Sequence, residues 1–370
     1  MKKFVLFVTA LAIGVCTTTA ADAKKKRKKR PPPVVSPTIH ADRTVTFRIK
    51  AANAEKINVG GEFQKGRIPL VKGEDNIWTV TTGPIAPGLY GYNFQVDGLS
   101  TLDPGNRFLK PMRSPKTSIL HIPGGNVFDF DPAIPHGTVH QHIYHSAPIK
   151  RTRELRIYTP PGYETGKDKY PLLVLQHGHS DSYATWTTYG KANLILDHLI
   201  AADKAVPMIV VMLDGHPIPD SYGNGRSINN VEELRRDLME VVLPMVEKEY
   251  RVKFGRRNRA IAGLSMGGLH SLSIGLEHSQ DFAWIGAFSA AVPKEQAPEI
   301  LLADPAKLNK NLNLLWISIG KSDFLLEENH AFRALLQKQK IDHEFHLTEG
   351  GHSWPIWRAY LAQFAPRLFR

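Results

Sequence analysis

The sequence predicts an α/β protein whose mainly parallel sheet has helices on both faces, preceded by a small all-β module. Residues 38–123 hold short segments in which apolar and polar residues alternate, as in strands that bury one face. From residue 151 on, uninterrupted apolar runs alternate with helical patterns, and strands that are apolar throughout are typical of a parallel sheet covered on both faces. The length of 370 residues fits two domains.

Residues 1–23 have the pattern of a secretory signal peptide. Two lysines precede an apolar run, residues 4–16, and residues 21–23 (Ala-Asp-Ala) fit a small-x-small cleavage site. The run is short for a transmembrane helix, so we expect an exported protein, periplasmic or extracellular, without a transmembrane anchor. A lipoprotein attached through Cys16 is the weaker alternative, because Val15 is bulky where such sites usually carry a small residue.

Cysteine content and charge exclude some kinds of site and some binding partners. Cys16 is the only cysteine, so the chain after the signal has no disulfide and no cysteine nucleophile. Of the net charge of +12, residues 31–370 carry only +4, and seven consecutive cations form Lys24–Arg30. We interpret residues 24–37 as a disordered basic and proline-rich tail. A weak contact of Lys24–Arg30 with an anionic surface is a further hypothesis, whereas nucleic-acid binding has little support behind a signal peptide.

The predicted module at residues 38–123 is built from short alternating strands. The expected strands are 44–49, 56–59, 77–80, 89–96 and 117–122, with a tight turn at Asp97-Gly98. Strands of this length and spacing indicate a β-sandwich. The run Pro87–Phe94 with Val96-Asp97-Gly98 resembles the early-set immunoglobulin-like modules of glycogen-branching enzymes and some esterases. We expect a structural or substrate-framing role, with glycan binding as the alternative.

Residues 124–150 are predicted to link the two domains. Four histidines crowd this stretch: His136, His140, His142 and His145. Their spacing lacks supporting cysteines or carboxylates in a recognisable order, so we expect no metal and favour a connecting strand.

The predicted second domain, residues 151–370, alternates strands and helices. Strands are expected at 154–158, 170–175, 208–213, 260–262, 284–288, 312–319 and 343–347. Helices are expected at 191–204, 231–250 with a bend at Pro244, from 269, at 325–340 and from 355. In such a sheet, active groups gather beyond the carboxyl ends of the strands.

The most informative motif is Gly263-Leu264-Ser265-Met266-Gly267, which has the spacing of a nucleophile elbow. There a serine sits on a sharp turn between a buried strand and a helix, with its hydroxyl above the sheet. The glycines leave room where a β-carbon would collide as the chain folds back. The alternative is a Gly/Ser-rich connecting turn, so the assignment depends on partners downstream.

A serine hydroxyl needs a base, and the base needs a third group that fixes its tautomer. The α/β-hydrolase fold places these in the order serine, acid, histidine. Asp323 follows the strand at 312–319, and His352 follows the next strand on a glycine-rich loop. Less well placed candidates are Asp281, Asp304, Asp342, His343 and His346. We therefore predict Ser265, Asp323 and His352 as the catalytic residues.

The expected oxyanion donors are the backbone N–H groups of Met266, at the helix N-terminus, and His179, after an early strand.

The chain resembles the putative-esterase family, which includes feruloyl, acetyl-xylan and enterochelin esterases and mycolyltransferases. The resemblance covers about residues 140–370. It rests on His177-Gly178, Ala192–Asp197, Pro207–Met212, Ala262–Gly268 and Gly350-Gly351-His352. It implies serine-dependent cleavage of carboxylic esters with no metal and no cofactor. A common asparagine of the family is Asp214 here, which changes the charge near the mouth of the site.

Export and the β module favour an acylated polysaccharide or oligosaccharide as the ester substrate, as for feruloyl or acetyl-xylan esterases. Trp186, Tyr222 and Trp354 are candidates for stacking on a sugar or aromatic acyl group, with core packing as the alternative for each. Two other functions stay open: a siderophore esterase of the enterochelin type, and a non-catalytic glycan-binding protein on a hydrolase scaffold. The intact Ser-Asp-His set argues against the latter. The sequence does not determine the oligomeric state.

Overall fold

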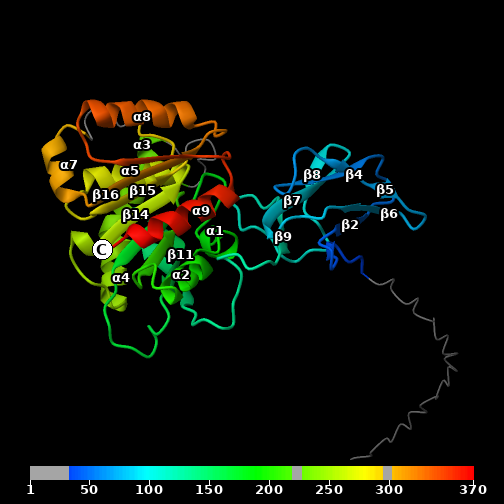
Figure 1. The fold of residues 1–370 in the computed structure, drawn as a ribbon, viewed down its shortest axis with the longest axis horizontal. Coiled ribbons are helices and arrows are strands. Elements are labelled where there is room, and N and C mark those ends of the chain that lie inside the picture. The colour runs from blue at the N-terminus through cyan, green and yellow to red at the C-terminus, as the bar shows by residue number, and fades with distance from the viewer. Residues whose placement is uncertain (1–32, 219–226, 295–301) are drawn as a thin grey trace, which may run out of the picture. The chain divides into compact units, whose positions relative to one another are not determined.

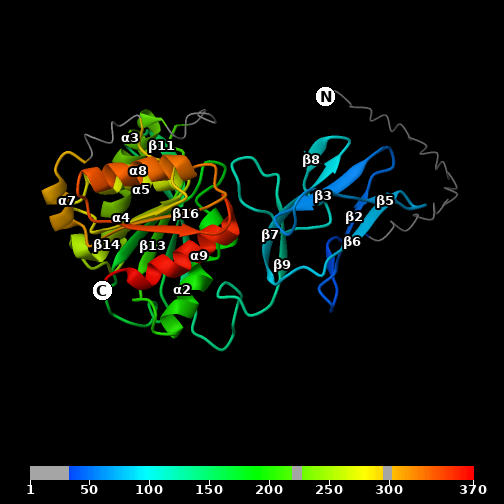
Figure 2. The ribbon, with the colours of Figure 1, turned by 45° about the horizontal axis from the view of Figure 1, so that its top comes forward.

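Two antiparallel sheets make up the N-terminal β module, residues 38–122, of the computed structural model, which describes residues 33–218, 227–294 and 302–370 (Figures 1 and 2). The first sheet has the order β1-β2-β6-β5, and the second has the order β4-β3-β7-β8 with β9 on β7. The strands are β1 (Thr38–Ile39), β2 (Val45–Lys50), β3 (Ile57–Gly61), β4 (Ile68–Pro69), β5 (Val71–Lys72), β6 (Ile77–Thr82), β7 (Gly88–Val96), β8 (Leu99–Thr101) and β9 (Ser118–Ile122).

Both sheets bury side chains in one shared hydrophobic cluster. Phe47 and Trp78 come from the first sheet, and Val59, Phe94 and Leu120 come from the second. Asn93 and Gln95, the neighbours of Phe94 along β7, are more polar and less buried, because successive side chains point to opposite faces. The expected strands are therefore present, while the immunoglobulin-like assignment stays a prediction.

The second domain is built on an eight-stranded sheet with the order β10-β11-β13-β12-β14-β15-β16-β17. Its strands are β10 (Thr138–Ser146), β11 (Arg151–Thr159), β12 (Leu172–Gln176), β13 (Ile209–Leu213), β14 (Arg259–Leu264), β15 (Trp284–Phe288), β16 (Leu314–Gly320) and β17 (Glu344–Thr348). β10 and β11 are antiparallel to their neighbours, and the other pairs are parallel. The predicted mainly parallel α/β-hydrolase sheet is confirmed.

Helices cover both faces of this sheet, as Figures 1 and 2 show. The helices are α1 (Thr185–Thr188), α2 (Ala192–Ala201), α3 (Ile228–Asp237), α4 (Leu243–Glu249), α5 (Met266–Glu277), α7 (Pro305–Asn311), α8 (Leu326–Lys338) and α9 (Trp354–Phe364). Leu172 and Val174 of β12 belong to the cluster with α3, α4, α5, α7 and α8. Leu173 and Leu175 belong to the cluster with α1, α2 and α9. This division explains why β12 is apolar throughout.

The strand expected within residues 124–150 is present as β10, and it pairs along its whole length with β11 at the edge of the second domain's sheet. One helix differs in detail from the sequence-based expectation. The helix expected at 231–250 is present but changes its winding at Leu238–Val242, where it forms a π-helical turn. The Leu243 N–H bonds to Leu238 O there. Pro244 has no N–H for a regular helical bond, and the wider turn accommodates this.

Within the described part of the chain, no helix is long and apolar enough to cross a membrane. The predicted signal peptide and most of the basic tail lie outside the described residues.

Candidate functional site

Ser265 stands at the turn between β14 and α5, with a backbone conformation of φ 55° and ψ −116° that side-chain-bearing residues rarely adopt. The turn is packed so closely that only glycine fits on either side. A β-carbon on Gly263 would lie 2.4 Å from the carbonyl oxygen of Gly267, and one on Gly267 would lie 2.5 Å from that of His177. The Gly-x-Ser-x-Gly pattern thus has a steric cause in this turn.

Three side chains from three strand ends meet at Ser265. His352 Nε2 lies 2.9 Å from Ser265 Oγ, and His352 Nδ1 lies 3.0 and 2.9 Å from the two carboxylate oxygens of Asp323. Because a carboxylate only accepts, Nδ1 carries the proton and Nε2 is free to accept from the serine hydroxyl. This is the arrangement of a nucleophile, a base and the group that orients the base.

The loop that carries Asp323 and the loop that carries His352 are joined by backbone hydrogen bonds. Lys321 and Ser322 donate their backbone N–H groups to Thr348 O (2.8 Å) and Gly350 O (2.9 Å). The His352 ring also packs against aromatic rings, with its centroid 4.4 Å from that of Phe324 and 4.9 Å from that of Trp357. Asp323 and His352 therefore keep their separation through backbone bonds as well as through their own contact.

Burial alone would raise the pKa of the Asp323 carboxyl, but hydrogen bonds from His352 and the Leu325 amide outweigh it and hold the pKa below its usual value. The carboxylate therefore stays ionised near neutral pH and can stabilise a positive charge on His352.

The two expected oxyanion donors come from the residue after Ser265 and from the turn at Gly178, where an added β-carbon would lie 3.5 Å from the β-carbon of Ser265. Met266 is the first residue of α5, so its N–H is at the positive end of the helix dipole. His179 lies in a turn closed by the Asp181 N–H, which donates to Gly178 O at 3.1 Å. His177 Nδ1 also bonds Gly178 O, at 2.8 Å. Because a trans peptide points its oxygen and its N–H in opposite directions, these two bonds fix the direction of the His179 N–H.

Two further histidines, whose roles the sequence did not reveal, hold this turn. His177 Nε2 accepts from the Gly215 N–H at 2.8 Å, which ties the turn to the segment after β13. His216 Nε2 donates to His179 O at 2.7 Å. His177 belongs to the His177-Gly178 pair on which the family resemblance rests, but that pair does not tell what its ring bonds. His216 is marked in the sequence only as a histidine just beyond the end of a strand, and such residues are too common to identify on that ground alone.

Asp214, at the position where the family commonly has asparagine, follows β13 next to this turn. Its Oδ1 accepts from the His216 N–H at 2.9 Å, and its backbone oxygen accepts from the Arg153 guanidinium. Arg153 is itself buried and pairs with Asp237 at 3.0 Å. The extra carboxylate itself lies 3.5 Å from His177 Nε2.

The proposed stacking residues have different surroundings. Trp186 and Trp354 are each 1% exposed and pack edge to face against each other, with ring centroids 5.0 Å apart. Both lie in the core, as the packing alternative describes, and present almost no surface to a ligand. Tyr222 lies outside the described residues.

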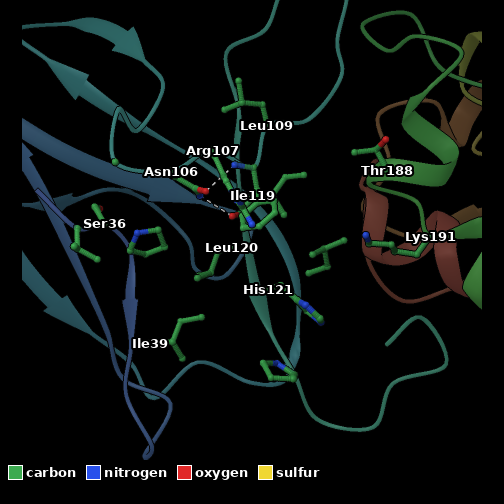
Figure 3. A pocket seen from close by; sticks show the side chains of 16 residues that line it. Ser36, Ile39, Asn106, Arg107, Leu109, Ile119, Leu120, His121, Thr188 and Lys191 are labelled. Atoms are coloured by element: carbon green, nitrogen blue, oxygen red, sulfur yellow. Dashed lines mark hydrogen bonds between the residues drawn. The ribbon is translucent and has the colours of Figure 1, made fainter. Parts of the chain in front are cut away.

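Two cavities differ in how they lie relative to the predicted catalytic residues. We call residues 178–181, which carry His179, the oxyanion turn. A polar pocket of about 260 Å³ lies next to this turn, and its lining includes His216, Asp214 and three arginines, Arg113, Arg151 and Arg153. A larger cavity of about 870 Å³ has a mostly apolar lining that includes Lys191 and His121 (Figure 3). None of the three predicted catalytic residues lines the larger cavity.

Three of the four histidines of residues 136–145 make ordinary pairwise contacts. His136 Nδ1 lies 2.9 Å from Asp197, His140 Nε2 lies 3.0 Å from the Thr159 hydroxyl, and His142 Nε2 contacts the Tyr250 hydroxyl. In the ranges that the structure describes, no group of three or more His, Cys, Asp or Glu side chains is arranged to hold a metal ion.

Comparisons with known proteins place the chain in a family and a fold. The family model described as "Putative esterase" matches residues 146–368. The chain is 29% identical to an endo-1,4-beta-xylanase/feruloyl esterase of Xylanibacter ruminicola, over 90% of this chain and 46% of that protein. The chain therefore spans about half the length of this relative.

Solved structures share the fold. A ferulic acid esterase is 26% identical and superposes with a TM-score of 0.56, covering 64% of this chain and all of its own. The enterobactin esterase of Shigella flexneri is 19% identical with a TM-score of 0.63, over 87% of this chain and 92% of its own, and this likeness concerns the fold alone. The family match spans more than half of the sequence and contains the elbow, the acid and the histidine. The chain belongs to the putative-esterase family.

Proposed function

We propose that this protein is an exported serine esterase that cleaves carboxylic esters by acyl transfer through Ser265. The observation that carries the proposal is the continuous hydrogen-bonded line from Ser265 Oγ through His352 to Asp323. Family membership and the feruloyl esterase relative support the same reaction class.

The mechanism follows from the contacts. His352 Nε2 takes the proton from Ser265 Oγ as the oxygen attacks the ester carbonyl, and Asp323 stabilises the imidazolium. The N–H groups of Met266 and His179 bind the oxygen on which negative charge develops. His352 then protonates the departing alcohol, and a water activated by the same nitrogen releases the acid and restores Ser265.

For the substrate, we propose an acyl ester of a polysaccharide or oligosaccharide. The support is the predicted signal peptide, the β module in front of the esterase domain, and a relative that joins a xylanase to a feruloyl esterase. The structure offers no exposed tryptophan beside the triad among its described residues, so the proposal concerns the class of ester and not the acyl group.

The second candidate is a siderophore esterase. It is favoured by Arg113 and Arg151 in the polar pocket next to the oxyanion turn, because cationic side chains suit an anionic iron-binding ester, although the pocket also carries the carboxylates of Glu154 and Asp214. Rates on methyl ferulate, acetylated xylan and a catecholate trilactone separate the two. A polysaccharide esterase acts mainly on the first or second compound, and a siderophore esterase acts mainly on the third.

The reaction class itself is tested at Ser265. We expect Ser265→Ala to lower kcat on an aryl acetate by about three to six orders of magnitude, because the nucleophile is lost while the fold is kept. A fluorophosphonate probe is expected to label the wild type and not this variant. Equal hydrolysis by both proteins, with matching circular dichroism spectra, would contradict the proposal.

A further inference from the structure

A short segment of the β module, residues 109–113, contacts the oxyanion turn directly, and we call it the strap. It begins at the module, where the Lys110 N–H donates to Thr117 O at 3.0 Å, just before β9. It ends at the turn, where the Arg113 N–H donates to Ser180 O at 3.1 Å. Strap and turn belong to one compact unit, Val34–Arg370.

Backbone contacts run along the strap between these ends. Met112 forms an antiparallel β-bridge with Asp181, and Pro111 O accepts hydrogen bonds from the hydroxyls of Ser182 and Thr185. The strap therefore pairs with residues 180–182 as a short strand would, and the turn that carries His179 has this pairing at its C-terminal side.

A buried ion pair connects the strap to the oxyanion turn. Lys110 Nζ lies 2.8 Å from Asp181 Oδ1, and the two side chains are only 10% and 3% exposed. Asp181 is also the residue whose N–H closes the turn onto Gly178 O. Because a buried carboxylate is costly without its cation, moving Asp181 away from Lys110 is strongly disfavoured.

Lys110 also reaches the histidine side of the site. Its Nζ lies 5.4 Å from the ring centroid of Trp354 and 5.4 Å from that of Tyr189. Trp354 follows His352 by two residues and begins α9. One cation of the β module therefore contacts both the oxyanion turn and the start of the helix after the catalytic histidine.

We propose that the strap, through Lys110, positions the oxyanion turn, so that the β module is part of the machinery for acyl transfer. The inference rests on the proposed function, since it assigns Lys110 as a positioning residue for the His179 N–H. The Gly178–His179 peptide is held at Gly178 O by His177 and by the Asp181 N–H, and the strap fixes Asp181. Without the ion pair, the Asp181 residue that closes the turn loses one of its anchors, and the His179 N–H is held less firmly, because His177 Nδ1 still bonds Gly178 O.

The test is Lys110→Met, which keeps the apolar stem and removes the charge. We expect kcat on an aryl acetate to fall about 10- to 100-fold, less than the roughly 10²- to 10³-fold loss of a whole oxyanion donor. KM is expected to stay within about 2-fold, because the oxyanion is bound in the transition state and not in the ground state. Affinity for an arylboronic acid, whose tetrahedral adduct with Ser265 needs the same donors, is expected to fall together with kcat.

Two variants serve as controls. Lys110→Arg keeps the charge and is expected to restore kcat to within about 3-fold of the wild type. Lys72→Met removes another module lysine, which lies over the Trp78 ring and donates to Ala52 O, and is expected to leave kcat unchanged. If Lys110→Met does not fold, Lys110→Gln is measured in its place.

The outcomes are distinct. A Lys110→Met kcat equal to that of Lys72→Met would overturn the positioning role, and so would a raised KM at unchanged kcat. A wild type without activity on any ester would instead contradict the proposed function.

Discussion

At the scale of single residues, His216 shows how the oxyanion turn depends on protonation. Burial lowers the pKa of its imidazole well below the ordinary histidine value, and the nearby His177 adds to this effect. The neutral ring donates from Nε2 to His179 O. His216 is thus a buried histidine whose unfolded form takes up a proton more readily than its folded form.

This difference predicts a pH dependence of stability. Below about pH 6.5 His216 takes up a proton in the unfolded chain but not in the folded chain. The stability that neutral His216 gives the folded state is therefore fully present above that pH and is lost as the pH falls. We expect the free energy of unfolding to decrease between pH 7.5 and 5 by up to about 2 kcal/mol more in the wild type than in His216→Gln. Urea titrations at both pH values measure this, and parallel decreases in the two proteins would argue against a lowered pKa.

At the scale of elements, the approach of α5 to the end of β12 sets the geometry of the elbow. A β-carbon on Gly267 would lie 2.5 and 2.6 Å from the backbone oxygens of His177 and Gln176. These oxygens cannot move without shifting the oxyanion turn that follows them. A β-carbon on Gly275, further along the same helix, would meet side-chain carbons of Ile285 and Ile261 at 2.8 and 2.9 Å. The two positions crowd different parts of the structure.

Alanine substitutions at Gly267 and Gly275 therefore separate an effect on stability through packing from an effect on catalysis. We expect both Gly267→Ala and Gly275→Ala to lower the free energy of unfolding by about 1 to 3 kcal/mol through overpacking. Only Gly267→Ala is expected to lower kcat, by at least about 10-fold, because it displaces an oxyanion donor. Chemical denaturation and aryl acetate kinetics on both variants measure these effects, and a similar loss of kcat in both would show that general destabilisation is the cause.

At the scale of the whole molecule, charge is distributed unevenly along the chain. Lys24–Arg30 hold seven of the cations, and residues 31–370 carry only +4. If this basic segment contacts anionic surfaces, deleting residues 24–30 is expected to reduce retention on an anionic polysaccharide matrix at low salt while kcat stays unchanged. The difference is expected to disappear near 1 M salt, where the Debye length is about 3 Å. Equal retention of both proteins at low salt would end the hypothesis.

Much of this protein follows from sequence periodicity and chain order alone. Apolar runs such as 172–175 predict strands buried on both faces, since burial on one face would leave every second residue polar. The elbow motif and the strand ends before Asp323 and His352 predict the site, because the carboxyl ends of parallel strands share one edge of the sheet. The confirmed fold and family rest on these local signals.

Other features depended on tertiary structure. Trp186 and Trp354 carry no sequence signal that distinguishes a stacking platform from core, and burial to 1% exposure decided between the two. The contact between Lys110 and Asp181 joins residues 71 positions apart, and neither residue belongs to a periodic pattern or motif. Pairing of this kind arises only when the chain folds back on itself, because it depends on which loops meet in space and not on which residues are neighbours in the sequence.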